Sequence, residues 1–203
     1  MWTNQRNQLT TIAKGYDKSI KLYTKDNWFC KSIAHILWFF SLIFTFGQKP
    51  FLPNIFLTQF ATAIGPFHFY PSEWNEFDVT NALPHEARHT KQCRWMGMCM
   101  HPLLGLPIVL LILLLPLPIG LAFGRLWMEL DAEKAKWRYW IQRYVIPEKV
   151  SSKKTVANMI RMRAENFATE LASESYCFTV PEYWATSVFQ KAAEGVINEA
   201  GLG

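Results

Sequence analysis

The stretch LPHEARHTKQC, residues 83–93, carries the strongest chemical signal in this chain. His85 and His89 are four positions apart, so on a helix they project from one side about 40° apart and both imidazoles can reach one metal ion. Glu86 directly follows the first histidine and points beside such an ion, where a carboxylate can take a proton from a bound water. This HExxH pattern therefore predicts a metal site on a helix.

The elements around this motif are predicted mainly as helices. We expect the motif helix at about 83–100, with Thr80 or Asn81 as its cap and Pro84 in its first turn. Residues 58–70 alternate loosely around a Gly65–Pro66 turn and are the only predicted strand or hairpin. Further helices are expected at 119–144, 154–175 and 181–197. The predicted fold class is mainly α with a small vestigial sheet, a zincin-like α+β fold.

The composition indicates a single apolar-rich domain. The chain has 203 residues, of which 50% are hydrophobic and 18% charged, with a net charge of +5. This excludes a disordered protein, and the charge is too mild to indicate nucleic-acid binding by itself. Four cysteines without a CxxC pair indicate neither a disulfide scaffold nor a zinc finger.

We expect one domain over residues 1–203, in three parts. Residues 1–27 are a polar N-terminal arm, residues 28–145 hold the zincin-like core, and residues 150–203 form C-terminal helices. The arm lacks the apolar stretch of a signal peptide. The predicted location is therefore membrane-associated or intracellular, and a location in a virion is a further possibility.

Two apolar stretches raise the question of membrane contact. Residues 33–46 are too short to span a bilayer and favour a buried or interfacial helix. Residues 103–123 are long enough to span, but Pro107, Pro116 and Pro118 interrupt them. We expect a Pro-broken helical hairpin there, buried in protein or dipping into a bilayer, with a single spanning helix as the second choice.

A catalytic zinc site needs a third protein ligand, and Glu129 is the best candidate. A straight span over 103–123 would hold Glu129 and the histidines on opposite sides of a membrane, whereas a hairpin returns the chain to them. Glu133 follows one turn later, where a carboxylate can orient a liganding histidine, and Arg125 can pair with either glutamate. Alternatively, these glutamates and Asp131 form a solvated acidic face.

HExxH followed downstream by Glu129-Leu130-Asp131-Ala132 resembles the gluzincin branch of zinc metallopeptidases. The resemblance covers residues 85–144, with a weaker echo in 62–74. The chain is also similar in layout to short bacterial and phage proteins, whose glutamine and arginine correspond here to Gln92 and Arg125. The resemblance implies that His85, His89 and Glu129 bind zinc, that Glu86 is the catalytic base, and that Glu133 supports a ligand. The chain departs from the family by having Glu rather than Asp at this last position.

We therefore expect a zinc-dependent peptidase that hydrolyses amide bonds in a peptide or protein substrate. The alternative is a metallopeptidase-like fold acting as a structural or interaction module with a protein assembly partner, in a virion or membrane complex. A third possibility is a small membrane protein in which HExxH is fortuitous. Membrane contact through 103–123 and 33–46 fits all three, and a nucleic-acid partner is not expected.

Overall fold

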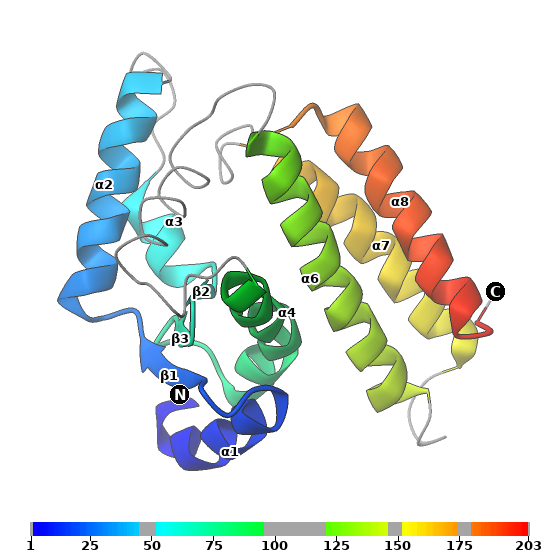
Figure 1. The fold of residues 1–203 in the computed structure, drawn as a ribbon, viewed down its shortest axis with the longest axis horizontal. Coiled ribbons are helices and arrows are strands. Elements are labelled where there is room, and N and C mark those ends of the chain that lie inside the picture. The colour runs from blue at the N-terminus through cyan, green and yellow to red at the C-terminus, as the bar shows by residue number, and fades with distance from the viewer. Residues whose placement is uncertain (1, 45–51, 96–120, 146–151, 174–179, 203) are drawn as a thin grey trace. The chain divides into compact units, whose positions relative to one another are not determined.

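The computed structural model describes residues 2–44, 52–95, 121–145, 152–173 and 180–202. The chain divides into two compact units, Met1–Leu115 and Pro116–Gly203. Helices dominate both, and the described strands belong to the first (Figure 1), so the predicted class of mainly α with a small sheet is confirmed. The boundary falls inside residues 28–145, and the single domain stays a prediction.

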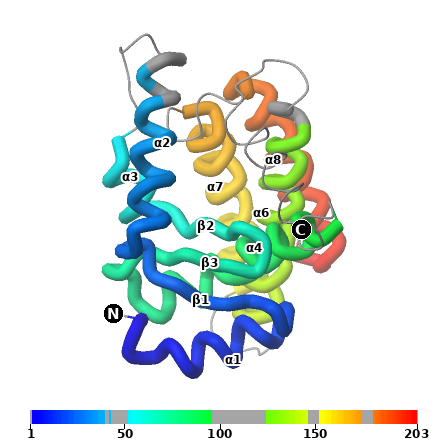
Figure 2. The backbone as a smooth tube through the Cα atoms, turned by 60° about the vertical axis from the view of Figure 1, so that its left-hand side comes forward, coloured from blue at the N-terminus to red at the C-terminus, as the bar shows by residue number. Residues whose placement is uncertain are grey.

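The first unit arranges short helices around a three-stranded sheet. In chain order it contains η1 (Trp2–Gln5), α1 (Arg6–Tyr16), β1 (Lys21–Thr24), α2 (Trp28–Phe44), α3 (Pro53–Thr58), β2 (Thr62–Ile64), β3 (Phe67–Tyr70) and α4 (Glu76–Trp95). Central β3 pairs in parallel with β1 and antiparallel with β2 (Figure 2). The predicted hairpin is confirmed as β2 and β3, and Gly65 makes its turn with a φ of 58° that favours glycine.

The N-terminal residues belong to the core of this unit, where the sequence alone indicates a polar arm. Trp2, Leu9 and Ala13 are fully buried and pack with Tyr70 and other residues of the sheet and α4. The Trp2 indole N–H donates to the Pro71 carbonyl over 2.9 Å. The following β1 was not predicted, because its four residues, Lys-Leu-Tyr-Thr, are too few to show a periodic pattern.

Helix α4, which carries the HExxH motif, begins several residues before its predicted start. Asn75 and Asp78 form a reciprocal capping box, in which each backbone N–H donates to the other side chain over 3.0 Å. Thr80 and Asn81, the predicted caps, lie inside the helix, so that prediction is wrong. Pro84 lies in the helix interior rather than in the first turn, and it leaves one intrahelical hydrogen bond unmade.

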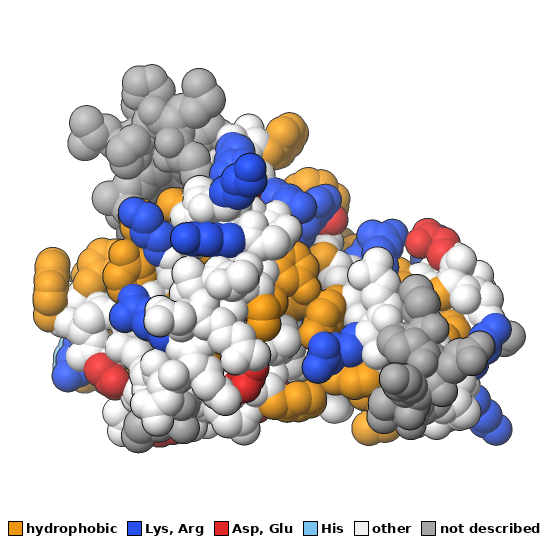
Figure 3. All heavy atoms as spheres, turned by 90° about the horizontal axis from the view of Figure 1, so that it is seen from below, with side chains coloured by type: hydrophobic (Ala, Val, Ile, Leu, Met, Phe, Trp, Pro, Cys, Tyr) orange, Lys and Arg blue, Asp and Glu red, His pale blue; other side chains and the backbone are white. Residues whose placement is uncertain are grey.

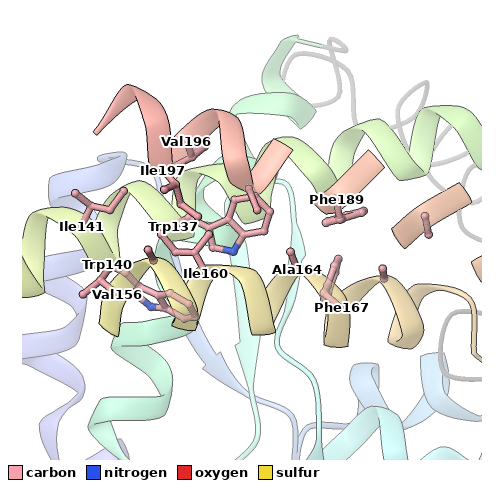
Figure 4. Close-up of a cluster of buried hydrophobic side chains, with 14 of the residues drawn as sticks. Trp137, Trp140, Ile141, Val156, Ile160, Ala164, Phe167, Phe189, Val196 and Ile197 are labelled. Carbon is pink, nitrogen blue, oxygen red and sulfur yellow. The ribbon is translucent and has the colours of Figure 1, made fainter. Parts of the chain in front are cut away.

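The second unit is formed by three helices, α6 (Leu121–Tyr144), α7 (Lys153–Leu171) and α8 (Glu182–Glu199), close to the predicted ranges. Their buried side chains interlock around Trp137, Phe167 and Phe189 (Figure 4), with ring centroids 5.4 Å apart in the Phe167–Phe189 pair. Ser152 caps α7 by accepting from the Thr155 N–H. This core supports α6, the helix that carries the acidic residues of the predicted site.

The predicted membrane segments have different outcomes. Most of residues 103–123, and with them the Pro-broken hairpin, lie outside the described residues; α6 begins at Leu121. Residues 33–46 fall largely in α2, which packs one side on the sheet and on α3. Among the helices that the structure describes, none is both long enough and apolar enough to cross a membrane.

Candidate metal centre

Helix α4 has a buried apolar side that determines where its HExxH residues point. Val79, Leu83 and Ala87 recur at helical spacing and pack against α1 and the sheet, which fixes the rotation of the helix. His85 and Glu86 are also buried, at only 8% and 6% exposed, although helical spacing puts His85 on the side opposite Leu83. The hydrophobic face of the helix therefore sets the direction in which its chemical groups point.

The two histidines of the motif are brought together as the sequence predicts. Their Nε2 atoms lie 3.1 Å apart and their rings meet edge to face, with centroids separated by 4.7 Å. Two nitrogens bound to one tetrahedral zinc ion at its usual bond lengths lie about 3.3 Å from each other. The observed separation is therefore close to that of two nitrogens bound to a shared zinc ion.

Gln92 sets the tautomer of one of these histidines. Its Oε1 atom lies 2.8 Å from His89 Nδ1, and since an amide oxygen only accepts, Nδ1 carries the proton. The lone pair of neutral His89 is then on Nε2, which faces His85. Such a second partner commonly orients a metal-binding histidine. Gln92 stands in the motif read from the sequence, and its spacing of three residues from His89 could have suggested this role, which was not predicted.

Glu86 lies near a buried cation that the sequence analysis did not single out. Lys25, at the end of β1, is 1% exposed; its Nζ donates to the Phe56 carbonyl over 2.6 Å and lies 3.7 Å from the Phe56 ring centroid. Burial lowers the pKa of Lys25 to about 7, against the attraction of Glu86, which raises it. A lysine in a run of charged residues gave no sequence signal of burial.

A chain of hydrogen bonds holds α4 against the sheet. Thr90 Oγ1 donates to the Gly65 carbonyl over 2.8 Å and lies 2.7 Å from His68 Nε2, so His68 is the donor to Thr90. The Tyr70 hydroxyl lies 3.4 Å from His68 Nδ1 and completes the chain. Burial first, and then the unfavourable interaction with the neighbouring His89 ring, lower the pKa of His68 to about 3, so His68 stays neutral. We name these four residues the His68 relay.

In the second unit, α6 carries the acidic residues of the predicted site. Glu133 is fully buried and accepts from Arg163, 3.1 Å away, with the Lys136 ammonium at 4.0 Å. This is a fixed ion pair rather than a solvated acidic face. Glu129 lies one turn earlier on the same side, and Arg125 one turn before that. The roles predicted for Glu129, Glu133 and Arg125 at a metal stay predictions.

Comparison with protein families, with characterised proteins and with solved structures gives no match for this chain. The resemblance to gluzincins therefore stays a prediction that depends on the motif and its geometry.

Proposed function

We propose that this protein is a zinc-dependent hydrolase of amide bonds in peptides or proteins, with His85, His89 and Glu129 as the zinc ligands. These three residues offer one ligand atom each, a set that could hold a metal ion. The observation that carries the proposal is the histidine pair on α4, whose Nε2 atoms lie 3.1 Å apart with Glu86 beside them.

The donor types favour zinc over other biological metals. Two imidazoles and one carboxylate are the ligands of a well-known class of catalytic zinc site, which keeps a fourth position open for water. Ca²⁺ and Mg²⁺ prefer sites made only of oxygen ligands. When bound, zinc would supply a Lewis acid that brings the pKa of a coordinated water to about 7.

The residues of the chain would then hold and move protons. Gln92 keeps the proton of His89 on Nδ1, so the lone pair of the neutral ring is on Nε2, the atom that would bind zinc. Glu86 would accept the proton of the attacking water and return it to the leaving amine. Lys25, with its ammonium held by Phe56, places a positive charge within electrostatic range of that carboxylate.

Helix α6 would contribute the third ligand from a rigid base. Glu133 is locked by Arg163 one turn away from Glu129, so the glutamate proposed as ligand projects from a helix that is itself fixed within its unit.

Zinc content tests the ligand set. The wild-type protein, purified without chelators, should hold about one zinc ion per chain, and His89→Ala and Glu129→Ala should each lose most of it. His35→Ala is the matched control, since His35 is exposed on α2 with its Nδ1 2.7 Å from the Lys31 carbonyl. No zinc in the wild type, or equal retention in all variants, would refute the site.

Activity tests the base. Glu86→Gln should retain zinc, while cleavage of a library of internally quenched peptides falls by about 10²–10⁴-fold. Cleavage by the wild type that Glu86→Gln leaves unchanged would contradict the role of Glu86. Stoichiometric zinc with no cleavage by the wild type would instead favour the second candidate, a metallopeptidase-like interaction module. The large apolar side chains exposed on α2 favour this candidate as a component of a membrane complex.

We also propose that the protein attaches to a membrane at its surface. The basis is that apolar side chains of α2 remain exposed although its opposite side is well packed.

A further inference from the structure

Helix α2 has two apolar sides, one packed in the core and one exposed among the residues that the structure describes. Cys30 and Ala34 are buried and pack with Phe56 of α3 and Phe69 of β3. On the opposite side of the helix, Trp28, Ile36 and Phe39 are 77%, 46% and 55% exposed. We name these last three residues the α2 outer face.

Other large apolar side chains extend this surface. Phe29 and Trp38 on α2, Leu52 before α3 and Phe67 on β3 are all more than a third exposed. Seen from below, orange hydrophobic side chains reach the surface on the left, the side on which Figure 1 draws α2, with blue Lys and Arg side chains among them (Figure 3). Apolar surface of this kind commonly marks a binding site.

The polar side chains on this side of α2 are already engaged by the helix itself. Ser32 Oγ donates to the Trp28 carbonyl over 2.9 Å, and His35 Nδ1 lies 2.7 Å from the Lys31 carbonyl. A protein interface needs about one hydrogen bond per 100–200 Å², and this face offers few free groups for them. An occupant that needs no directional partners, such as lipid, fits better.

Charge favours an anionic occupant. No Asp or Glu occurs between Asp26 and Glu73, and the only charged residues in between are Lys31 and Lys49. Lys31 is exposed on α2, and the Lys21 ammonium lies 5.9 Å from the Phe67 ring centroid. Asp26, at the edge, accepts from Ser72 over 3.1 Å. A second copy of the chain would set these cations against their equivalents.

The geometry points to α2 lying flat on an anionic phospholipid bilayer, with Trp28, Ile36 and Phe39 inserted at the boundary between headgroups and acyl chains. This inference rests on the surface attachment proposed above and names the lipid and the contact. Tryptophan favours that depth, and cations at the edge of an apolar helix face bind anionic headgroups. It is independent of the metal chemistry.

Flotation with vesicles tests the contact. The full-length protein is mixed with phosphatidylcholine vesicles, with or without phosphatidylglycerol. We expect the wild type to bind the anionic vesicles, and the triple variant Trp28→Ser, Ile36→Ser, Phe39→Ser to bind about a hundredfold more weakly, because three large apolar contacts are lost. A triple variant of exposed residues in the second unit, Met159→Ser, Met162→Ser, Tyr183→Ser, is the matched control and should bind as the wild type does. Circular dichroism verifies that all three proteins are folded.

The outcomes separate the two claims. Binding by the wild type to neither vesicle would overturn both surface attachment and the contact through α2. Equal binding by the wild type and the α2 variant would overturn the contact alone. A dimer in light scattering that the α2 variant abolishes, without vesicle binding, would assign the α2 outer face to a second copy and overturn the inference. None of these three results changes the zinc or cleavage tests.

Discussion

Removal of a single hydroxyl, in Thr90→Val, should destabilise the first unit through the His68 relay. Thr90 and His68 are both fully buried, and the Thr90 hydroxyl both accepts from His68 and donates to the Gly65 carbonyl. Valine has a similar shape but leaves both of these groups without a partner. A buried group without its hydrogen bond costs about 1–3 kcal/mol, so we expect a loss of about 2–4 kcal/mol in the free energy of unfolding.

Urea unfolding of the zinc-free protein measures this loss without a contribution from metal binding. The matched control is Thr90→Ser, which keeps the hydroxyl and removes one methyl group, at a cost of about 1 kcal/mol. The valine variant should shift the midpoint without a change in slope, since the surface exposed on unfolding stays the same. A loss below about 1 kcal/mol in the valine variant, or equal losses in both, would refute the relay as a source of stability.

Four further predictions follow from other buried groups. The pKa of His68 is about 3 in the folded protein and 6.5 in the unfolded chain, so between these pH values the unfolded chain binds one more proton. The free energy of unfolding should therefore fall by about 1.4 kcal/mol for each unit of acidification in this range. Urea unfolding of His68→Gln at several pH values should show a weaker dependence on pH. The pKa of Lys25 is about 7 in the folded protein and 10.5 in the unfolded chain, so here too the unfolded chain binds the extra proton. Relative to Lys25→Met, the free energy of unfolding of the wild type should therefore rise as the pH rises from 7 towards 10. A difference between the two proteins that does not change with pH would contradict this. Glu133→Gln breaks the buried ion pair with Arg163 and should lower the free energy of unfolding, measured by thermal unfolding, by about 3 kcal/mol. The control Glu194→Gln, in the exposed pair with Arg161, should cost much less. Equal losses would argue against a structural role for Glu133. Trp2→Ala should cost about 3–5 kcal/mol in urea unfolding, and a loss below 1 would mean that the N-terminal segment is an arm after all.

The parts of the fold that the sequence predicted are those set by local periodicity. His85 and His89 meet because four residues make about one helical turn, and no tertiary information is needed for that. The three helices of the second unit follow from their apolar spacing in the same way. The start of α4 was misplaced because a proline is most often read as a first-turn residue, whereas Pro84 lies deep in this helix.

The residues that the sequence analysis missed are brought in by pairing across long separations. His68 reaches Thr90 because β3 lies beneath α4, and Lys25 is buried because β1 pairs with β3 in parallel, with Thr24 opposite Tyr70. The register of a four-residue strand gives no readable pattern in advance. A lysine among other charged residues therefore looks like part of a solvated arm until the sheet places it.

These missed residues bear directly on the proposed chemistry. The His68 relay and the capping box fix α4 without any metal, so the histidine pair is held in a binding geometry before an ion arrives. Within the second unit, the ion pair between Glu133 and Arg163 fixes α6 in a similar way. An ion would thus find each set of ligands ordered, and little of its binding free energy would be lost in ordering side chains. If the proposed ligand set is correct, the zinc affinity of Glu129→Ala, compared with that of His89→Ala, measures how much the carboxylate adds to a site that the histidine pair already orders.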